Sequence, residues 1–175
     1  MGVEGSSDVV IVGAGPSGCA AGLMLRRAGW DVTVIDAATF PRDKVCGDAL
    51  SPEAVQLIEE LGASAAIERA PHARYTRAAA IFPDGARIER QHVDAGYIVP
   101  RMHLDQGLVQ ALRASGARLL EGQRVQELLR DGDRVCGVRG PGVRWTGRVV
   151  IASDGYASVA SKLLGQADTL SLIHI

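Results

Sequence analysis

The chain has 175 residues and a formal net charge of −1, with 19 Lys and Arg against 20 Asp and Glu. Its 47% hydrophobic and 22% charged residues are typical of a globular domain. A charge near zero without basic runs argues against nucleic acid as a partner. No stretch reaches the roughly 18 consecutive apolar residues that a membrane span needs. The three cysteines have neither disulfide nor metal-ligand spacing, and the start lacks a signal-peptide pattern, so we expect a cytoplasmic protein without a metal site.

The first half of the chain opens with a strand–helix–strand pattern. Residues 8–13 (DVVIVG) are a continuous β-branched run of the kind that a parallel sheet buries. A helix is predicted from Pro16 to Ala28, ended by Gly29, and residues 30–36 (WDVTVID) then form a second parallel strand. Together they predict a βαβ unit with a right-handed crossover.

The middle of the chain mixes helices with a hairpin. After a polar loop at 37–50, Ser51 and Pro52 are an N-cap and a first-turn proline for a helix. The turn Pro83-Asp84-Gly85 between two β-rich runs predicts a hairpin. A short strand at 97–100 and a helix at 103–114 follow.

The last third is mainly β. A strand is predicted at 117–122, a meander of short strands at 124–145, and another buried strand at 148–153 that ends at Asp154-Gly155. The fold class is therefore α/β: a Rossmann-like sheet with an antiparallel meander and a second β excursion. The final segment, LSLIHI, resembles a translated sequencing adapter, and we expect residues 166–175 to be a non-native tail; a genuine C-terminal strand is the alternative.

A glycine-rich loop joins the first strand to the first helix. In Gly13-Ala-Gly15-Pro16-Ser17-Gly18, the first glycine permits the tight turn and the second lets the backbone approach a pyrophosphate. The third allows close helix packing, and the helix N-terminus offers unpaired N–H groups to phosphate. Asp36, at the end of the second strand, is placed to accept hydrogen bonds from an adenosine ribose and disfavours NADP there.

Two further stretches suggest which dinucleotide binds. Residues 40–52 (FPRDKVCGDALSP), Arg101 in YIVPRMHLD and Asp154-Gly155 in VVIASDGYAS, together with the opening loop, resemble the p-hydroxybenzoate hydroxylase-like flavoprotein superfamily. The Arg42-x-Lys44-x-Cys46-Gly47 pattern resembles the geranylgeranyl reductase family within it. The resemblance runs from about residue 8 to residue 165. It implies that residues 1–165 are the N-terminal part of an FAD-binding domain, with about 66–98 an excursion toward a substrate domain.

The resemblance implies roles for individual residues. Pro16, Ser17 and the neighbouring glycines would contact the FAD pyrophosphate, and Val125 would meet the adenine through its backbone. Arg101 would lie against FAD, and Asp154 with Gly155 would help to hold it. The flavin region would be lined by a short segment, Cys46, Gly47 and Ala49. Many relatives carry a second glycine where this chain has Asp48.

Several single residues keep two interpretations. Cys46 is either a catalytic group beside the flavin, favoured by a lowered thiol pKa near Lys44 or Arg42, or a small residue packed against the cofactor. Arg42 and Lys44 either contact FAD phosphate or are solvated charges. Asp105, near a helix start, is explained by the helix dipole alone, and Cys19 and Cys136 are expected in the core.

The resemblance implies an FAD-dependent oxidoreductase that reduces isolated C=C bonds of a polyprenyl or other lipid substrate, with NAD(P)H or another reductant as electron donor. A lipid substrate would also imply peripheral contact with the inner face of the membrane. The alternatives are an aromatic or alkene monooxygenase using NAD(P)H and O2, and a non-catalytic nucleotide-binding module. The superfamily's later Gly-Asp motif is absent, so we expect the 175-residue chain by itself to be inactive.

Overall fold

The computed structural model describes residues 2–156 and 158–165, so the predicted tail at 166–175 lies outside the described residues. The chain divides into two compact units, which are described separately. Unit 1 combines residues 1–40 with 112–175, and unit 2 consists of residues 41–111. The excursion predicted at about 66–98 falls inside unit 2.

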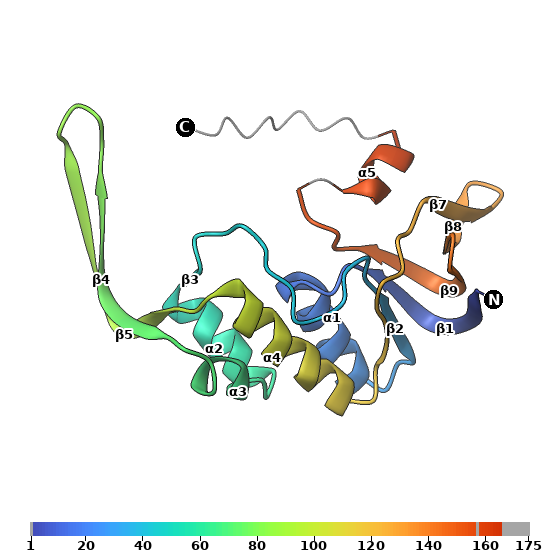
Figure 1. Ribbon diagram of the computed structural model, residues 1–175, viewed down its shortest axis with the longest axis horizontal. Coiled ribbons are helices and arrows are strands. Elements are labelled where there is room, and N and C mark those ends of the chain that lie inside the picture. Colours follow the sequence, from blue (N-terminus) through green and yellow to red (C-terminus); the bar gives the residue numbers. More distant parts are fainter. Residues whose placement is uncertain (1, 157, 166–175) are drawn as a thin grey trace. The chain divides into compact units, whose positions relative to one another are not determined.

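Unit 1 is built on a six-stranded mixed sheet in the order β6-β2-β1-β9-β8-β7 (Figure 1). The strands are β1 (Val3–Val12), β2 (Val32–Ile35), β6 (Arg118–Leu120), β7 (Glu127–Asp131), β8 (Arg134–Gly140) and β9 (Val143–Ala152). β1 pairs in parallel with β2 and β9, and β2 pairs in parallel with β6. The β7-β8 and β8-β9 pairs are antiparallel, which confirms the predicted meander.

One long strand belongs to both the parallel and the antiparallel part of the sheet. β9 pairs antiparallel with β8 through residues 143–146 and in parallel with β1 from Val143 to Ala152. The sequence had predicted a meander at 124–145 and a separate strand at 148–153. β1 is also longer than predicted, because residues 3–7 pair with β9 as well. The meander and the parallel sheet therefore share one continuous strand.

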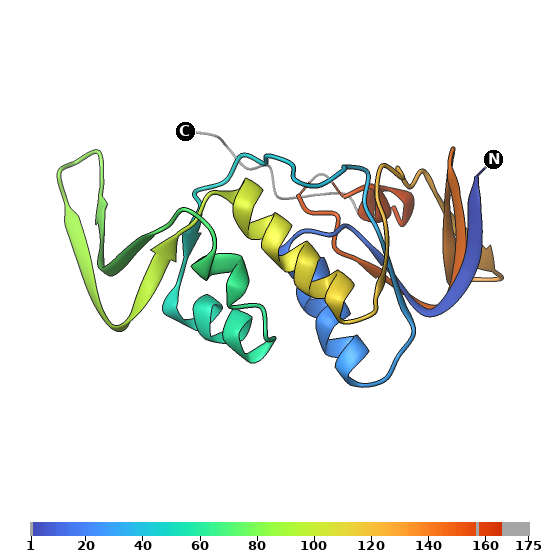
Figure 2. The same cartoon turned by 60° about the horizontal axis from the view of Figure 1, so that its bottom comes forward.

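The core of unit 1 lies on both faces of this sheet. Val9 and Ile11 are buried, and so are Val10 and Val12 on the opposite side of the strand. One face packs a cluster made of Val10, Val12, Ile35, Val125, Val138, Val143 and Trp145. The helix α1 (Pro16–Arg27) runs beside β1 and β2 (Figure 2), and Gly29 ends it with φ +85°, as the sequence predicted.

Unit 2 contains a three-stranded antiparallel sheet in the order β3-β5-β4. Its elements are β3 (Ala49–Leu50), α2 (Pro52–Glu60), α3 (Ala65–Glu68), β4 (Ala73–Ile81) and β5 (Arg87–Ile98). Ser51 caps α2 by accepting a hydrogen bond from the N–H of Ala54, and the hairpin turns at Phe82–Ala86 with Gly85 at φ +86°. Both features confirm the sequence prediction.

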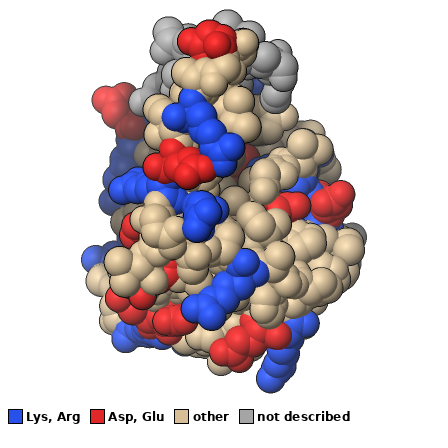
Figure 3. All heavy atoms as spheres, turned by 90° about the vertical axis from the view of Figure 1, so that its left-hand side faces the viewer, with Lys and Arg blue, Asp and Glu red and all other residues tan. Residues whose placement is uncertain are grey.

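The β4–β5 hairpin exposes arginines and aliphatic side chains together. Ile81, Phe82 and Ile88 are exposed beside Arg87 and Arg90. Figure 3 views the molecule from this side and shows basic and acidic side chains interleaved among the other residues. The helix α4 (Arg101–Ala114) follows β5 and begins two residues earlier than predicted. In the part of the chain that the structure describes, no helix is long and apolar enough to cross a bilayer.

Candidate functional site

The phosphate loop, residues 13–18, connects β1 to α1 in unit 1. Gly13 has φ +100°, and a Cβ there would lie 2.5 Å from the carbonyl oxygen of Ser153. A Cβ on Gly18 would overlap the carbonyl oxygen of Gly13. Glycine is therefore required at both positions by the backbone itself, because the turn is left-handed and the helix passes directly over it.

The N-terminus of α1 is open to an anion. Gly15 is the N-cap, with extended backbone and no side-chain capping bond, and Pro16 begins the helix. The first backbone hydrogen bond of the helix runs from the Cys19 N–H to the Gly15 carbonyl oxygen. The N–H groups of Ser17 and Gly18, which precede it, therefore have no acceptor within the helix. The first turn carries no acidic residue, and Ser17 is exposed. These donors and the helix dipole fit a pyrophosphate.

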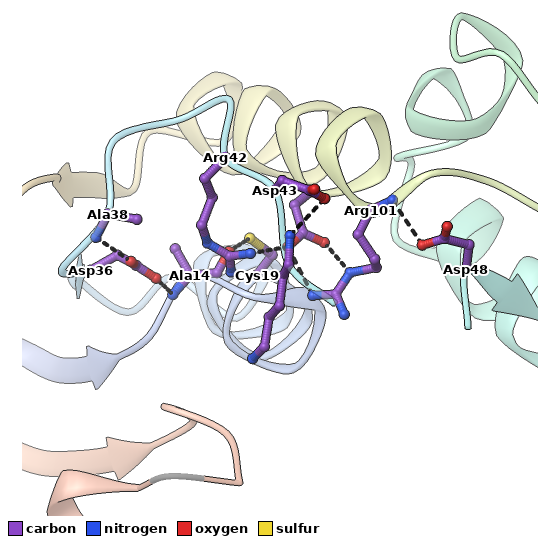
Figure 4. Close-up of polar contacts among 10 residues, drawn as sticks. Ala14, Cys19, Asp36, Ala38, Arg42, Asp43, Asp48 and Arg101 are labelled. Carbon is purple, nitrogen blue, oxygen red and sulfur yellow. Dashed lines mark hydrogen bonds and ion pairs between the residues drawn. The ribbon is translucent and has the colours of Figure 1, made fainter. Parts of the chain in front are cut away.

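Asp36 clamps the phosphate loop from the end of β2 (Figure 4). Its Oδ2 accepts a hydrogen bond of 2.7 Å from the N–H of Ala14, and its Oδ1 accepts one of 2.7 Å from the N–H of Ala38. Each carboxylate oxygen keeps a further lone pair, so the group can still accept a ribose hydroxyl. The sequence predicted the ribose contact and missed the clamp.

Val125 lies just before β7 with its side chain buried in the unit 1 core. Among the described residues, no hydrogen-bond partner is found for its backbone N–H or C=O. Buried backbone groups are almost always paired. The unpaired groups therefore fit the predicted contact with an adenine edge, which would satisfy both of them.

Asp154 and Gly155 follow β9 and precede the last described helix, α5 (Val159–Leu163). The Asp154 carboxylate accepts hydrogen bonds from the Ser158 hydroxyl at 2.7 Å and from the N–H of Val159 at 2.6 Å. Gly155 has φ +83°. Asp154 therefore caps α5 within the chain, and its predicted contact with FAD remains a prediction.

In unit 2, the Cys46 loop (residues 41–48) is joined to the start of α4 by Asp48. Asp48 has φ +56° and is the sole non-glycine residue with positive φ in the described ranges. Its Oδ1 accepts a 3.1 Å hydrogen bond from the N–H of Arg101, and its carbonyl accepts one of 2.8 Å from Val99. The left-handed conformation thus occurs where the resemblance implies glycine, and these hydrogen bonds help to hold it.

A buried carboxylate organises two arginines at this loop. Asp105 is fully buried and receives a two-pronged contact from Arg101, Nε to Oδ1 at 2.7 Å and Nη2 to Oδ2 at 2.8 Å. Arg42 Nη1 lies 2.9 Å from Asp105 Oδ2. Explaining Asp105 by the helix dipole alone was wrong, since its two oxygens are bound by side chains. The i,i+4 spacing of Arg101 and Asp105 was the available signal.

Cys46 is exposed and has a modified acidity. Hydrogen bonds from the Asp48 backbone N–H and from the Arg101 guanidinium lower the pKa of the thiol, because both favour the thiolate. The hydrogen bonds to Asp105 in turn raise the pKa of Arg101, which stays a cation. Lys44 and Arg42 were the groups expected to act on Cys46; the structure gives that role to Arg101.

Gly47 and Ala49 flank this cluster on its solvent side. A Cβ on Gly47 would meet no atom within 4 Å, and its backbone is not left-handed. Ala49 pairs with Ile98 in the sheet and is exposed. Nothing in the described protein requires a glycine at 47, so its predicted approach to a flavin remains a reason for the residue. The described residues contain no group of three or more His, Cys, Asp or Glu that could hold a metal.

The sequence matches the model of a known protein family. A model of the FAD binding domain matches residues 6–171. The chain belongs to this family. That result confirms the p-hydroxybenzoate hydroxylase-like superfamily and FAD as the cofactor class. The phosphate loop and Asp36, whose geometry fits a dinucleotide, lie within the matched residues.

The relatives of this chain include enzymes. Menaquinone reductase of Mycobacterium tuberculosis is 38% identical over 173 residues, covering 95% of this chain and 42% of that protein. Rifampicin monooxygenase of Rhodococcus hoagii is 29% identical, covering 90% of this chain and 33% of that protein. The chain thus spans about two fifths of the length of the menaquinone reductases that it matches.

Solved structures support the fold. The flavin-dependent brominase Bmp2 superposes with a TM-score of 0.82 at 24% identity, covering 93% of this chain and 41% of that one. PqsL of Pseudomonas aeruginosa does so with a TM-score of 0.79 at 23% identity, covering 97% and 48%. The predicted α/β, Rossmann-like fold is confirmed. The narrower likeness to geranylgeranyl reductases is not established by these relatives.

Proposed function

We propose that this chain is the dinucleotide-binding part of an FAD-dependent reductase that saturates isolated C=C bonds of a polyprenyl lipid. The observation that carries the proposal is the 38% identity to a menaquinone reductase over 95% of the chain. A menaquinone is a quinone with a polyprenyl side chain, so the substrate class agrees with the geranylgeranyl reductase-like Cys46-Gly47 pattern.

In this proposal, unit 1 binds the adenosine diphosphate end of FAD. The N–H groups of Ser17 and Gly18 donate to the pyrophosphate, and Asp36 accepts from the ribose. The backbone of Val125 pairs with the adenine. Asp154 supports this region by fixing the start of α5. Binding and orientation are what these residues contribute.

Residues of unit 2 serve the flavin end in the proposal. Arg101, Cys46, Gly47 and Ala49 have the predicted contacts, and the Cys46 thiol is the candidate proton-transfer group. When bound, FAD supplies the redox chemistry, receiving two electrons from NAD(P)H or another reductant and passing them on as hydride. Saturating one double bond would require two electrons from the reductant and two protons, one of which a residue of the chain could deliver. A thiol whose pKa is lowered can release a proton more readily near neutral pH.

A monooxygenase is the second candidate. The 29% identity to a rifampicin monooxygenase favours it, and the same FAD-binding residues would serve both reactions. The two candidates differ in what the substrate gains: two hydrogen atoms in the reductase and one oxygen atom in the monooxygenase. For a lipid substrate, we further propose a cytoplasmic enzyme with peripheral contact at the inner face of the membrane.

The complete gene product, loaded with FAD, provides the test. It is incubated with a polyprenyl quinone under a reducing system, first without and then with O2, and the product is analysed by mass spectrometry. A stable gain of two hydrogen atoms in the side chain, independent of O2, supports the reductase. A gain of one oxygen atom with matched O2 uptake supports the monooxygenase instead. A Cys46→Ser variant tests the thiol: a lower turnover with unchanged FAD content is expected if it moves a proton.

A further inference from the structure

The Cys46 loop and the first turn of α4 share a charge cluster that the proposed function does not explain. Two guanidinium groups, Arg42 and Arg101, meet one carboxylate, Asp105. The Asp105 side chain is fully buried, whereas those of Arg101 and Arg42 are 12% and 17% exposed. Burying a carboxylate is unfavourable in free energy unless the charge is paired. Here the buried Asp105 carboxylate is paired with two arginines.

The geometry at Arg101 is specific. Its Nε and Nη2 donate to the two oxygens of Asp105, which fixes both the position and the plane of the guanidinium. The backbone N–H of the same residue is held by Asp48 Oδ1. Arg101 is therefore restrained at both ends, and its guanidinium also hydrogen-bonds to the Cys46 thiol.

One charged side chain and two backbone groups act on the exposed Cys46 sulfur. Among the groups that act on Cys46, Arg101 is the charged side chain, and the Asp48 and Gly47 contributions come from the backbone. Besides Arg42, the charged residues of the loop are Asp43, Lys44 and Asp48. The Asp43 carboxylate accepts the Lys44 N–H at 2.8 Å, and Asp48 Oδ1 accepts the Arg101 N–H.

We propose that Asp105 is a positioning residue whose buried carboxylate holds Arg101, with Arg42 as a second anchor, so that the Arg101 guanidinium stays against the Cys46 thiol. Asp105 itself does not touch the thiol. Asp105 acts on the thiol through Arg101. This role is the same whether the complete protein is a reductase or a monooxygenase.

The direction in which the pKa of the Cys46 thiol changes in a variant tests the proposal. In Asp105→Asn the chain loses a negative charge beside Arg101. If Arg101 stayed in place, that loss would lower the thiol pKa further. If Asp105 holds Arg101, the guanidinium leaves and the thiol pKa rises by about one unit. Asp43→Asn is the matched control, because it removes the same charge from the Cys46 loop without touching Arg101.

The measurement is the rate of Cys46 alkylation by iodoacetamide against pH, followed on the 175-residue chain by peptide mass spectrometry to separate Cys46 from Cys19 and Cys136. For Asp105→Asn we expect a midpoint about one pH unit higher and a rate about tenfold lower at a pH below both midpoints. A midpoint that falls, or that matches Asp43→Asn, overturns the proposal.

Asp105→Asn could fail to fold, because a buried ion pair that loses one partner is strongly destabilised. A second variant therefore tests the same proposal. Arg101→Lys keeps the charge balance of the cluster but cannot present two parallel donors to Asp105. The alkylation midpoint should rise here too, with the circular dichroism spectrum of the folded chain retained. An unchanged midpoint in folded Arg101→Lys refutes the positioning role.

Discussion

The N–H of Ala14 donates a 2.7 Å hydrogen bond to Asp36 Oδ2, tying the end of β2 to the phosphate loop. The carboxylate expected to bind the ribose therefore also shapes the loop expected to bind the pyrophosphate. Ala14 is fully buried, so its N–H has no access to water if the carboxylate is removed.

Replacing Asp36 should therefore affect folding and binding together. In Asp36→Ala, two backbone N–H groups lose their acceptor, and the free energy of unfolding should fall by about 1–3 kcal/mol. Asp36→Asn keeps one acceptor oxygen and should lose less. Urea denaturation measures the stability, and titration with ADP measures the affinity, which should fall in both variants. Full stability in Asp36→Ala would contradict the clamp.

Gly13→Ala should destabilise unit 1 strongly. The positive φ costs an L-residue about 1–2 kcal/mol, and the new Cβ would lie 2.5 Å from the Ser153 carbonyl oxygen. Gly29→Ala is the matched control, because Gly29 also has positive φ but a Cβ there would meet no atom within 4 Å. The difference between the two melting temperatures isolates the backbone contact, and equal values would rule it out.

Gly47→Ala tests the flavin end of the proposed site. Nothing in the described protein approaches that position, so the free energy of unfolding should stay within about 0.5 kcal/mol of wild type. If the flavin lies against Gly47, the methyl group should weaken FAD binding while leaving ADP binding unchanged. Fluorescence titration with both ligands provides the comparison. Unaltered FAD affinity would remove Gly47 from the site.

Substitutions at Asp48 should separate backbone strain from hydrogen bonding. Asp48→Ala keeps the left-handed φ and loses the bond to the Arg101 N–H, so it should cost about 1–2 kcal/mol. Asp48→Gly loses the bond but relieves the strain and should lie close to wild type, as should Asp48→Asn. Chemical denaturation of the three variants gives the order. A glycine variant as unstable as the alanine variant would argue against strain at this residue.

The pH dependence of Cys46 follows from its lowered thiol pKa. Because the folded chain favours the thiolate, alkylation should reach half of its maximal rate at a lower pH than in the urea-unfolded chain, where a free cysteine has a pKa of about 8.5. At any pH between the two midpoints the folded chain should therefore react faster. Equal midpoints in the folded and unfolded states would show that Asp48 and Arg101 do not act on the sulfur.

Much of unit 1 could be predicted from local pattern. The run at 8–13 is β-branched and uninterrupted, and Gly29 stops the helix where a left-handed residue is needed. The extent of β1 and β9 could not be predicted this way. Residues 3–7 form a strand because β9 offers them a partner, and that partner lies far away in the chain.

By itself, the sequence determined the βαβ unit, its glycine turn and the acid at the end of β2, because each depends on neighbouring residues and on backbone conformations that few residue types allow. The tertiary structure alone decided that Asp105 is buried and that Arg42 joins Arg101 on it. Burial of a charge depends on what packs around it from distant parts of the chain, and a spacing of four residues carries no information about that surrounding.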